Sequence, residues 1–320
     1  MLKETNIGEF KKNWILFPEV AVDETLLLFK GRFRFKQHIR GKPNSTGIKI
    51  YAMNDKTGFF YDYWFYRGKN GKTTEIVSNF VEKIEKQSHN YTIYTDSYYG
   101  GLDLAEYLND RGFYFVLSCG KNRPSFLFND CLHQELEKGN CSSTVNSSES
   151  FFALSFKDKK IFNVLSNFGN PLEIAYSNKG KRVPEVVNDY NMNMHGVDKG
   201  DRYVNCYMPS FRNRSWKFAA LLGCLYITIS NLTLFKNDLL DQDISLKENL
   251  ENLAHFLSPN PKIIPEITHP ASKTHHLSTN QVRGRCSFTG CGSDDKRTHL
   301  YCSRCKKYFH SICFQETHDD

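Results

Sequence analysis

The sequence lacks an apolar run of the roughly 18 residues that a membrane-spanning helix needs. Its longest apolar stretch, FAALLGCLYITI at residues 218–229, is too short and contains Gly and Thr. The first residues, MLKETNIGEFKKNW, lack a hydrophobic signal core. We therefore expect neither membrane insertion nor secretion. The sequence also has no internal repeat.

Charge of one sign is only in small excess. The net charge of +7 at pH 7 is a weak indication of a polyanionic partner such as nucleic acid. Hydrophobic residues make up 40% of the chain and aromatic residues 14%, which predicts a packed globular core rather than disorder. The 320 residues suffice for one large domain or a few smaller ones.

The order of expected elements predicts an α/β fold. Residues 14–66 predict successive strands. They are followed by an amphipathic helix at 72–87, the strand YTIYTD, the helix GLDLAEYLNDRG and the strand FYFVLSC. About residues 124–180 predict a β-rich insertion that contains FFALSF and KIFNVLSNF. Residues 184–207 and 215–236 predict one helix each.

Four acidic residues lie at positions that suggest a function for their charge. Asp23 lies inside a hydrophobic strand, where a carboxylate is rarely buried without a partner. Asp96 ends a strand, where ligand sites gather in open α/β sheets. Asp198 and Asp201 are three apart in HGVDKGDRY and share one helix face.

Taken singly, each acid fits an ordinary solvent-facing, turn or helix-surface position. Together they predict a site for a hard cation such as Mg²⁺. Two such ions can activate a water or a 3′-hydroxyl in phosphoryl transfer.

The segments VDETLLLFKGR, KPNSTGIKIYAMNDKTGF, YTDSYYGGLDLAEYL and HGVDKGDRY resemble piggyBac-type transposases, in the same order, over about residues 18–236. The resemblance implies an RNase H-like catalytic core. It implies Asp23, Asp96 and Asp198 as the catalytic triad, with Asp201 as a further metal-binding acid. The implied enzyme uses two Mg²⁺ ions, or Mn²⁺, to excise a DNA element through hairpin ends and insert it at TTAA sites.

The same resemblance carries expectations about partners and completeness. It implies action on DNA in the nucleus, a homodimer, and no membrane. Full-length members have a long region before the first catalytic Asp, whereas 22 residues precede Asp23 here. The chain is therefore expected to be an N-terminally truncated copy.

Two basic segments predict DNA contacts. In FKGRFRFKQHIRGKP, strand alternation would put Lys30, Arg32, Arg34 and Lys36 on one face, where the row can follow phosphates together with Lys42. A solvated strand edge would have the same pattern. In SFRNRSWKF, a cluster of Arg212, Arg214 and Trp216 predicts a clamp or stacking platform for an unpaired DNA end, although Trp216 also suits a core position.

The C-terminal segment predicts a zinc-binding domain. Its Cys and His pairs have metal-ligand spacing: Cys286, Cys291, Cys302, Cys305, His310, Cys313 and His318. A cross-braced arrangement would join Cys286, Cys291, His310 and Cys313 around one Zn²⁺. The other three ligands would hold a second Zn²⁺, completed by His299 or a water. Metal binding would supply the folding energy, and the module would bind either DNA, as the resemblance implies, or protein.

These expectations combine into one organisation. Residues 1–211 form the catalytic domain, 212–257 a helical extension that is part of a dimerisation and DNA-binding region, 258–285 a linker and 286–320 the zinc domain. The leading hypothesis is a cut-and-paste transposase. The alternatives are a domesticated, non-catalytic DNA-binding protein and a zinc module for protein interaction. The presence of all three acids favours the first.

Overall fold

The computed structural model describes most of the chain in two compact units, Met1–Glu251 and Asn252–Asp320. The described residues are 10–39, 45–68, 71–84, 90–120, 136–146, 148, 150–177, 180–208, 215–258, 277–287, 291, 297–302, 307–308 and 310. Each unit is described by itself.

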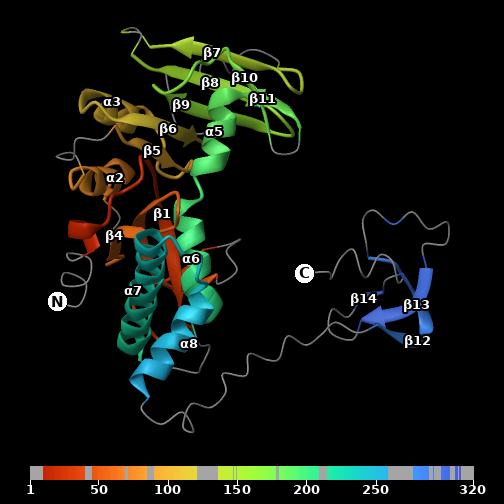
Figure 1. Cartoon of the computed structure of the whole chain (residues 1–320). Helices are drawn as coiled ribbons and strands as arrows, with labels where there is room; N and C mark the ends of the chain where they lie inside the picture. The colour runs from red at the N-terminus through yellow and green to blue at the C-terminus, as the bar shows by residue number, and fades with distance from the viewer. Residues whose placement is uncertain are drawn as a thin grey trace. The chain divides into compact units, whose positions relative to one another are not determined.

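A mixed β-sheet forms the centre of the first unit (Figure 1). In the described residues it has nine strands in the order β2-β3-β1-β5-β6-β9-β8-β7, with β4 also paired to β3. Strands β1, β5 and β6 are parallel, and their other neighbours pair antiparallel. The strands are β1 (Glu19–Leu28), β2 (Lys36–His38), β3 (Thr46–Asp55), β4 (Phe60–Phe65), β5 (Thr92–Thr95), β6 (Tyr114–Cys119), β7 (Cys141–Val145), β8 (Phe152–Lys157) and β9 (Ile161–Ser166).

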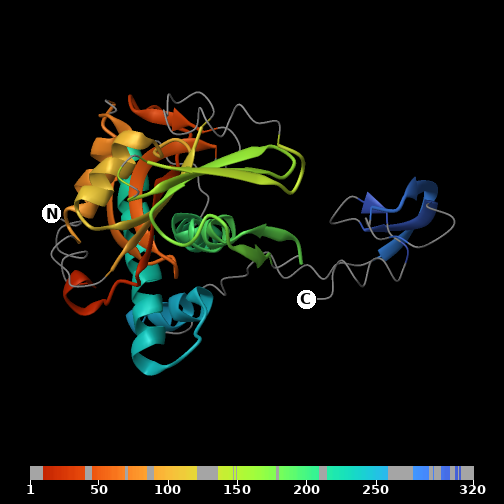
Figure 2. The ribbon, with the colours of Figure 1, turned by 90° about the horizontal axis from the view of Figure 1, so that it is seen from above.

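Helices cover both faces of this sheet, as Figures 1 and 2 show for α2 and α3 on one face and α5 on the other. A small hairpin of β10 (Ile174–Tyr176) and β11 (Arg182–Pro184) precedes α5. The helices are α2 (Thr73–Val81), α3 (Leu102–Asp110), α5 (Glu185–Asn193), α6 (Gly196–Tyr207), α7 (Trp216–Leu240) and α8 (Leu246–Leu257).

Strand β1 is buried on both faces, which explains the hydrophobic runs VAV and LLL on either side of its polar centre DET. Val20 and Val22 pack in the cluster that contains residues of α2 and α3. Ala21 and Leu27 pack in a second cluster with residues of α6 and α7. Because strand residues alternate between faces, Asp23 shares the α6 face with Ala21 and Leu27.

The structure differs from the expected helix at residues 184–207, which is two helices. Helix α5 ends at Asn193 and α6 begins at Gly196. His195 between them has φ −86° and ψ 11°, outside the helical region. At Gly196 an added Cβ would lie 2.5 Å from the backbone oxygen of Asp55. The break therefore brings α6 close to the sheet backbone.

The strands expected in an insertion extend the main sheet. β9 pairs with β6, where Val116 lies opposite Ser166, and β8 pairs with β9. FFALSF and KIFNVLSNF were thus correctly predicted as strands. Because β9 pairs directly with β6, they continue the sheet that carries Asp23.

Helix α7 corrects the expectation drawn from residues 218–229. Among the described helices, it alone is long and apolar enough to cross a membrane by length and composition. Its packing accounts for that composition. Asn231 exchanges two 2.9 Å hydrogen bonds with the backbone of Phe60, and Gly223 lies against Leu27. One side of α7 is thus part of the core of the first unit.

The second unit contains a three-stranded antiparallel sheet of β12 (Leu277–Arg285), β13 (Arg297–Cys302) and β14 (Lys307–Tyr308). Strand β12 lies within residues 258–285, the stretch that the sequence predicted as linker. Its apolar residues, Leu277 and Val282, do not alternate with polar ones, so the sequence of this segment has no clear strand pattern.

Candidate active site

Asp23 and Asp96 are brought close by the parallel register of β1 and β5. Val22 of β1 pairs with Thr95, the last residue of β5, and the next residues in that register are Asp23, in the middle of β1, and Asp96, just after β5. Each carboxylate is oriented locally: the Asp23 Oδ1 accepts from the Glu24 N–H at 2.7 Å, and the Asp96 Oδ1 accepts from the Tyr98 N–H at 2.9 Å. The carboxyl end of β5 and the middle of β1 thus carry two acids at neighbouring positions of the sheet.

Two buried tyrosines, Tyr99 and Tyr190, are affected by the charge of both acids. Burial is the main cause that raises the pKa of Tyr99 and of Tyr190. The negative charges of Asp23 and Asp96 raise the pKa of both phenols further. Since a charge acts most strongly on near neighbours, both acids lie near both rings.

Asp198 enters from helix α6. Two contacts fix how α6 runs along β1: Gly196 lies against Ala21, and the Asp201 carboxylate accepts from the Thr25 hydroxyl. Asp198 lies between these contacts in the sequence of α6, so its helix runs along the part of β1 that contains Asp23. Its side chain is 50% exposed, and its Oδ2 is 3.4 Å from the His195 Nδ1.

We call Asp23, Asp96 and Asp198 the acid edge. Its donors are carboxylate oxygens from three separate segments, which is the ligand chemistry that Mg²⁺ and Mn²⁺ prefer. The side chains do not close to ligand spacing: in the described part of the chain, the group with three or more ligand atoms within 4.8 Å of one another lies in the second unit.

Asp201 has a structural partner on each side. Its Oδ1 accepts from the Thr25 hydroxyl and, at 2.6 Å, from the Asn205 side-chain amide. These bonds tie α6 to β1. Its predicted role as a fourth metal ligand stays a prediction.

Sequence reasoning missed a clamp beside the acid edge. The hydroxyl of Tyr99, which is fully buried, donates to the Glu24 Oε2 at 2.6 Å. Lys49 Nζ lies 3.6 Å from the same oxygen. Because the Tyr99 N–H also bonds the Asp96 carbonyl at 3.2 Å, the clamp links the turn that holds Asp96 to β1. A buried phenol needs a partner, but Glu24 is 75 residues away in sequence, so the sequence carries no signal for this pair.

Part of the predicted DNA-binding set gathers in one open groove of about 600 Å³. We call it the Arg32 groove; its lining residues are Arg32, Phe33, Arg34, Phe35, Lys36 and Trp216. The Phe33 and Trp216 rings stack at 4.8 Å between centroids, and Trp216 is 40% exposed. Trp216 is thus not a plain core residue.

The strand alternation expected for this segment is wrong. β1 ends at Leu28 and β2 begins at Lys36, so a loop carries Arg32 and Arg34. The Lys36 Nζ donates to the Gly31 carbonyl at 3.0 Å, which closes this loop. Lys42, Arg212 and Arg214 lie outside the described residues.

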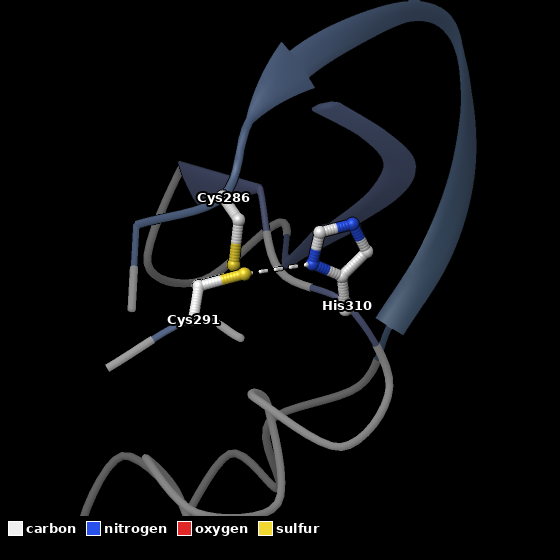
Figure 3. A group of neighbouring side chains, drawn as sticks. All are labelled: Cys286, Cys291 and His310. Carbon is white, nitrogen blue, oxygen red and sulfur yellow. Dashed lines mark hydrogen bonds between the residues drawn. The ribbon is translucent and has the colours of Figure 1, made fainter. Parts of the chain in front are cut away.

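In the second unit, Cys286, Cys291 and His310 point toward one another (Figure 3). Their ligand atoms all lie within 4.8 Å of one another, and Cys291 Sγ is 3.3 Å from His310 Nδ1. These are three of the four ligands predicted for the first zinc site. Cys305, Cys313 and His318 lie outside the described residues, as do the side chains of Cys302 and His299.

Comparisons with known proteins show which family the chain resembles. A family model described as "Transposase IS4" matches residues 7–231. The chain is 24% identical over 331 residues to the human "PiggyBac transposable element-derived protein 3", covering 94% of this chain and 55% of the relative. The human "Chimeric ERCC6-PGBD3 protein" is also 24% identical, with 94% of this chain and 31% of the relative covered. The chain thus spans about half the length, or less, of these curated relatives.

A solved structure has a similar fold. The structure titled "Cryo-EM structure of piggyBac transposase synaptic complex with hairpin DNA" matches with a TM-score of 0.66 and 22% identity. The match covers 95% of this chain and 69% of that chain. At this identity the likeness concerns the fold.

Proposed function

The chain belongs to the piggyBac-type transposases, and from this premise we propose that it is the catalytic part of a metal-dependent enzyme that cuts and joins DNA strands. One observation carries the proposal. The β1–β5 register continues to Asp23 and Asp96, and α6, the helix that contains Asp198, packs along β1; this packing supports the assignment of the three acids to one site. The strand order β3-β1-β5-β6, antiparallel and then parallel, supports an RNase H-like core.

The acid edge suits two-metal phosphoryl transfer. Bound Mg²⁺ or Mn²⁺ ions would supply activation of a water or 3′-hydroxyl and stabilisation of the leaving oxygen. Asp23, Asp96 and Asp198 would hold the ions, and Asp201 would keep α6 against β1 through Thr25. The half-exposed Asp198 leaves the edge open to a strand from solvent.

DNA is the partner that the surface favours. The Arg32 groove combines positive charge with exposed rings, which suits backbone contacts and stacking of an unpaired end. One human relative is named as a transposable element-derived protein, and the matched structure holds hairpin DNA by its title. We propose hairpin transposon ends and TTAA-type targets as substrates, the nucleus as the place of action, and a homodimer as the assembly.

The second unit is proposed to bind Zn²⁺. Two thiols and one imidazole within ligand distance suit tetrahedral zinc. Cys313 would complete this site, and Cys302, Cys305 and His318 would belong to a second one. A binding experiment with zinc-loaded chain separates two ligands of this module, transposon-end DNA and another protein: the ligand that the chain binds is the one assigned.

A strand-cleavage and strand-joining assay tests the proposed activity. Wild-type chain with Mg²⁺ should nick a hairpin end and join a pre-cut end to target DNA. Asp96→Ala should abolish both reactions and keep DNA affinity. Asp103→Ala, which removes an exposed acid in the first turn of α3, should keep both.

A wild-type chain that binds DNA without cutting or joining it, with Mg²⁺ or Mn²⁺, would contradict the catalytic proposal. That outcome would favour the second candidate, a domesticated DNA-binding protein. The observation behind this candidate is the transposable element-derived name of the human relative.

A further inference from the structure

A second aromatic groove lies between β4 and α2. It has a volume of about 470 Å³, which is within the range for a ligand of nucleotide size. We call it the Trp64 groove. The lining residues that matter here are Tyr51, Trp64, Tyr66, Arg67, Glu75 and Lys83.

The aromatic residues of the Trp64 groove are held in place by contacts with one another and with the core. Trp64 stacks on the fully buried Phe80 at 3.8 Å between centroids. Tyr51 meets Trp64 at 6.1 Å and Tyr66 at 6.3 Å. Trp64 and Tyr66 are half-buried, so the same rings are held by the core and open to the groove. A rigid, partly exposed aromatic wall is a stacking platform for a nucleobase.

The groove has one cation that can meet an anionic ligand. Its lining residues include the cations Lys83 and Arg67 and the acid Glu75. Lys83 is ion-paired with Asp62 and lies 5.2 Å over the Trp64 ring. Arg67 is exposed, and within the described residues no ion pair or hydrogen bond engages its guanidinium. Arg67 is therefore available to a phosphate.

The Trp64 groove adjoins the Arg32 groove. Gly68, next to Arg67, packs so tightly on Phe35 that an added Cβ would overlap the ring. Phe35 lines the Arg32 groove. A strand that leaves the Arg32 groove over Phe35 thus meets Arg67 and Tyr66 next.

The position of the Trp64 groove determines which nucleotide of a DNA strand it can bind. Tyr51 pairs with Glu24 across the β1–β3 ladder but belongs to the cluster on the α2 face, opposite the acid edge. The groove therefore suits a nucleotide distant from the phosphate that reacts.

We propose that the Trp64 groove binds one unpaired nucleotide of a DNA strand whose preceding backbone lies in the Arg32 groove. The base stacks on Trp64 and Tyr66, and Arg67 binds its phosphate. The inference rests on the proposed function, because it takes DNA as the ligand.

Fluorescence anisotropy with two DNA probes tests it: a blunt duplex, and the same duplex with a single-stranded tail. Wild-type chain should bind the tailed probe more tightly. Tyr66→Ala with Arg67→Ala should weaken tailed-probe binding about 10-fold or more and leave blunt-duplex binding within about 2-fold. Tyr66→Phe keeps the ring and should bind like wild type. Tyr176→Ala removes an exposed tyrosine outside both grooves and is the control.

The outcomes separate the two proposals. Equal loss for both probes, or no loss for either, contradicts the groove inference while DNA binding stands. A wild-type chain that binds neither probe contradicts the proposed function and this inference with it. A 2-aminopurine base in the tail should be quenched at one position in wild type. Quenching that persists in the Ala double variant would overturn the assignment to this groove.

Discussion

At the scale of single residues, the hydrogen bond from Tyr99 to Glu24 joins the two chain segments that carry Asp23 and Asp96. Tyr99→Phe removes only the hydroxyl and keeps Lys49 near the Glu24 carboxylate. A hydrogen bond to a charged group contributes about 1–3 kcal/mol, so urea unfolding should show a loss of this size.

Tyr114→Phe is the matched control for that change. Tyr114 is 38% exposed on β6, and removing its hydroxyl should alter the unfolding free energy by less than about 0.5 kcal/mol. If both variants unfold like wild type, the clamp does not hold the two segments together.

The buried Asp55 leads to a prediction about how the stability of the fold depends on pH. Burial raises its pKa, partly offset by hydrogen bonds from Thr57, Trp14 and Phe59. A raised pKa means that the folded state binds the proton more tightly than the unfolded state. The contribution of Asp55 to stability therefore falls as pH rises from its unfolded pKa of about 3.9 through the folded pKa, and is constant above it.

The comparison of wild type with Asp55→Asn isolates this group. Measured by urea unfolding across that pH window, the stability advantage of wild type should shrink as pH rises. An advantage that grows with pH would mean that the four hydrogen bonds outweigh burial. The variant should be less stable at every pH, because an amide donor would face the Trp14 indole N–H.

The residue scale also shows the limits of sequence reasoning. Asp23 and Asp96 were predictable because each charge interrupts or ends a hydrophobic strand. The bonds of Asp201 to Thr25 and Asn205 were not, because Thr25 is 176 residues away in sequence. Tyr99 and Tyr190 were missed for the same reason: their partners come from the fold.

At the scale of elements, the contact of α6 with the sheet determines where Asp198 lies. Gly200 is two residues from Asp198, and an added Cβ would lie 2.6 Å from the Phe60 ring and 2.7 Å from the Gly58 oxygen. In an exposed helix, Gly→Ala normally stabilises by about 1 kcal/mol. Gly200→Ala should instead destabilise the protein by about 1–3 kcal/mol and reduce strand cleavage.

Thermal unfolding and the cleavage assay measure this effect, with Arg202→Ala on the exposed side of α6 as control. A stabilised Gly200→Ala protein with normal cleavage would show that α6 tolerates a larger separation from the sheet than the structure indicates.

Helices and strands with a clear hydrophobic periodicity were predicted well. Strands β1, β3, β5 and β6 and helices α2 and α3 lie within the predicted segments. Two features were missed: the break between α5 and α6, and the loop that replaces a strand at residues 29–35. Both lack a proline or a composition change, and each depends on tertiary contacts, Gly196 on Asp55 and Phe33 on Trp216.

At the scale of the whole molecule, the two units predict separate responses to metal removal. A zinc-selective chelator should expose β12 to β14 to hydrogen exchange, because the second unit is proposed to depend on Zn²⁺ for folding. Strands β1, β5 and β6 should keep their protection. Metal analysis should find about two zinc ions per chain. One or none would refute the cross-brace.

Cysteine variants sharpen that test. Cys286→Ser should lower the zinc content and the protection of β12, whereas Cys206→Ser removes an exposed thiol of α6 and should change neither. Protection of β12 to β14 that is the same with and without chelator would contradict a metal-dependent second unit.

The most direct test of the central claim asks whether the acid edge is one metal centre. Iron(II) bound there and supplied with peroxide generates radicals that cut the backbone nearby. The account predicts cuts close to Asp23, Asp96 and Asp198, competed by Mg²⁺ and abolished by Asp96→Ala. Cuts confined to one of these segments, or a pattern that Asp96→Ala leaves unchanged, would contradict it.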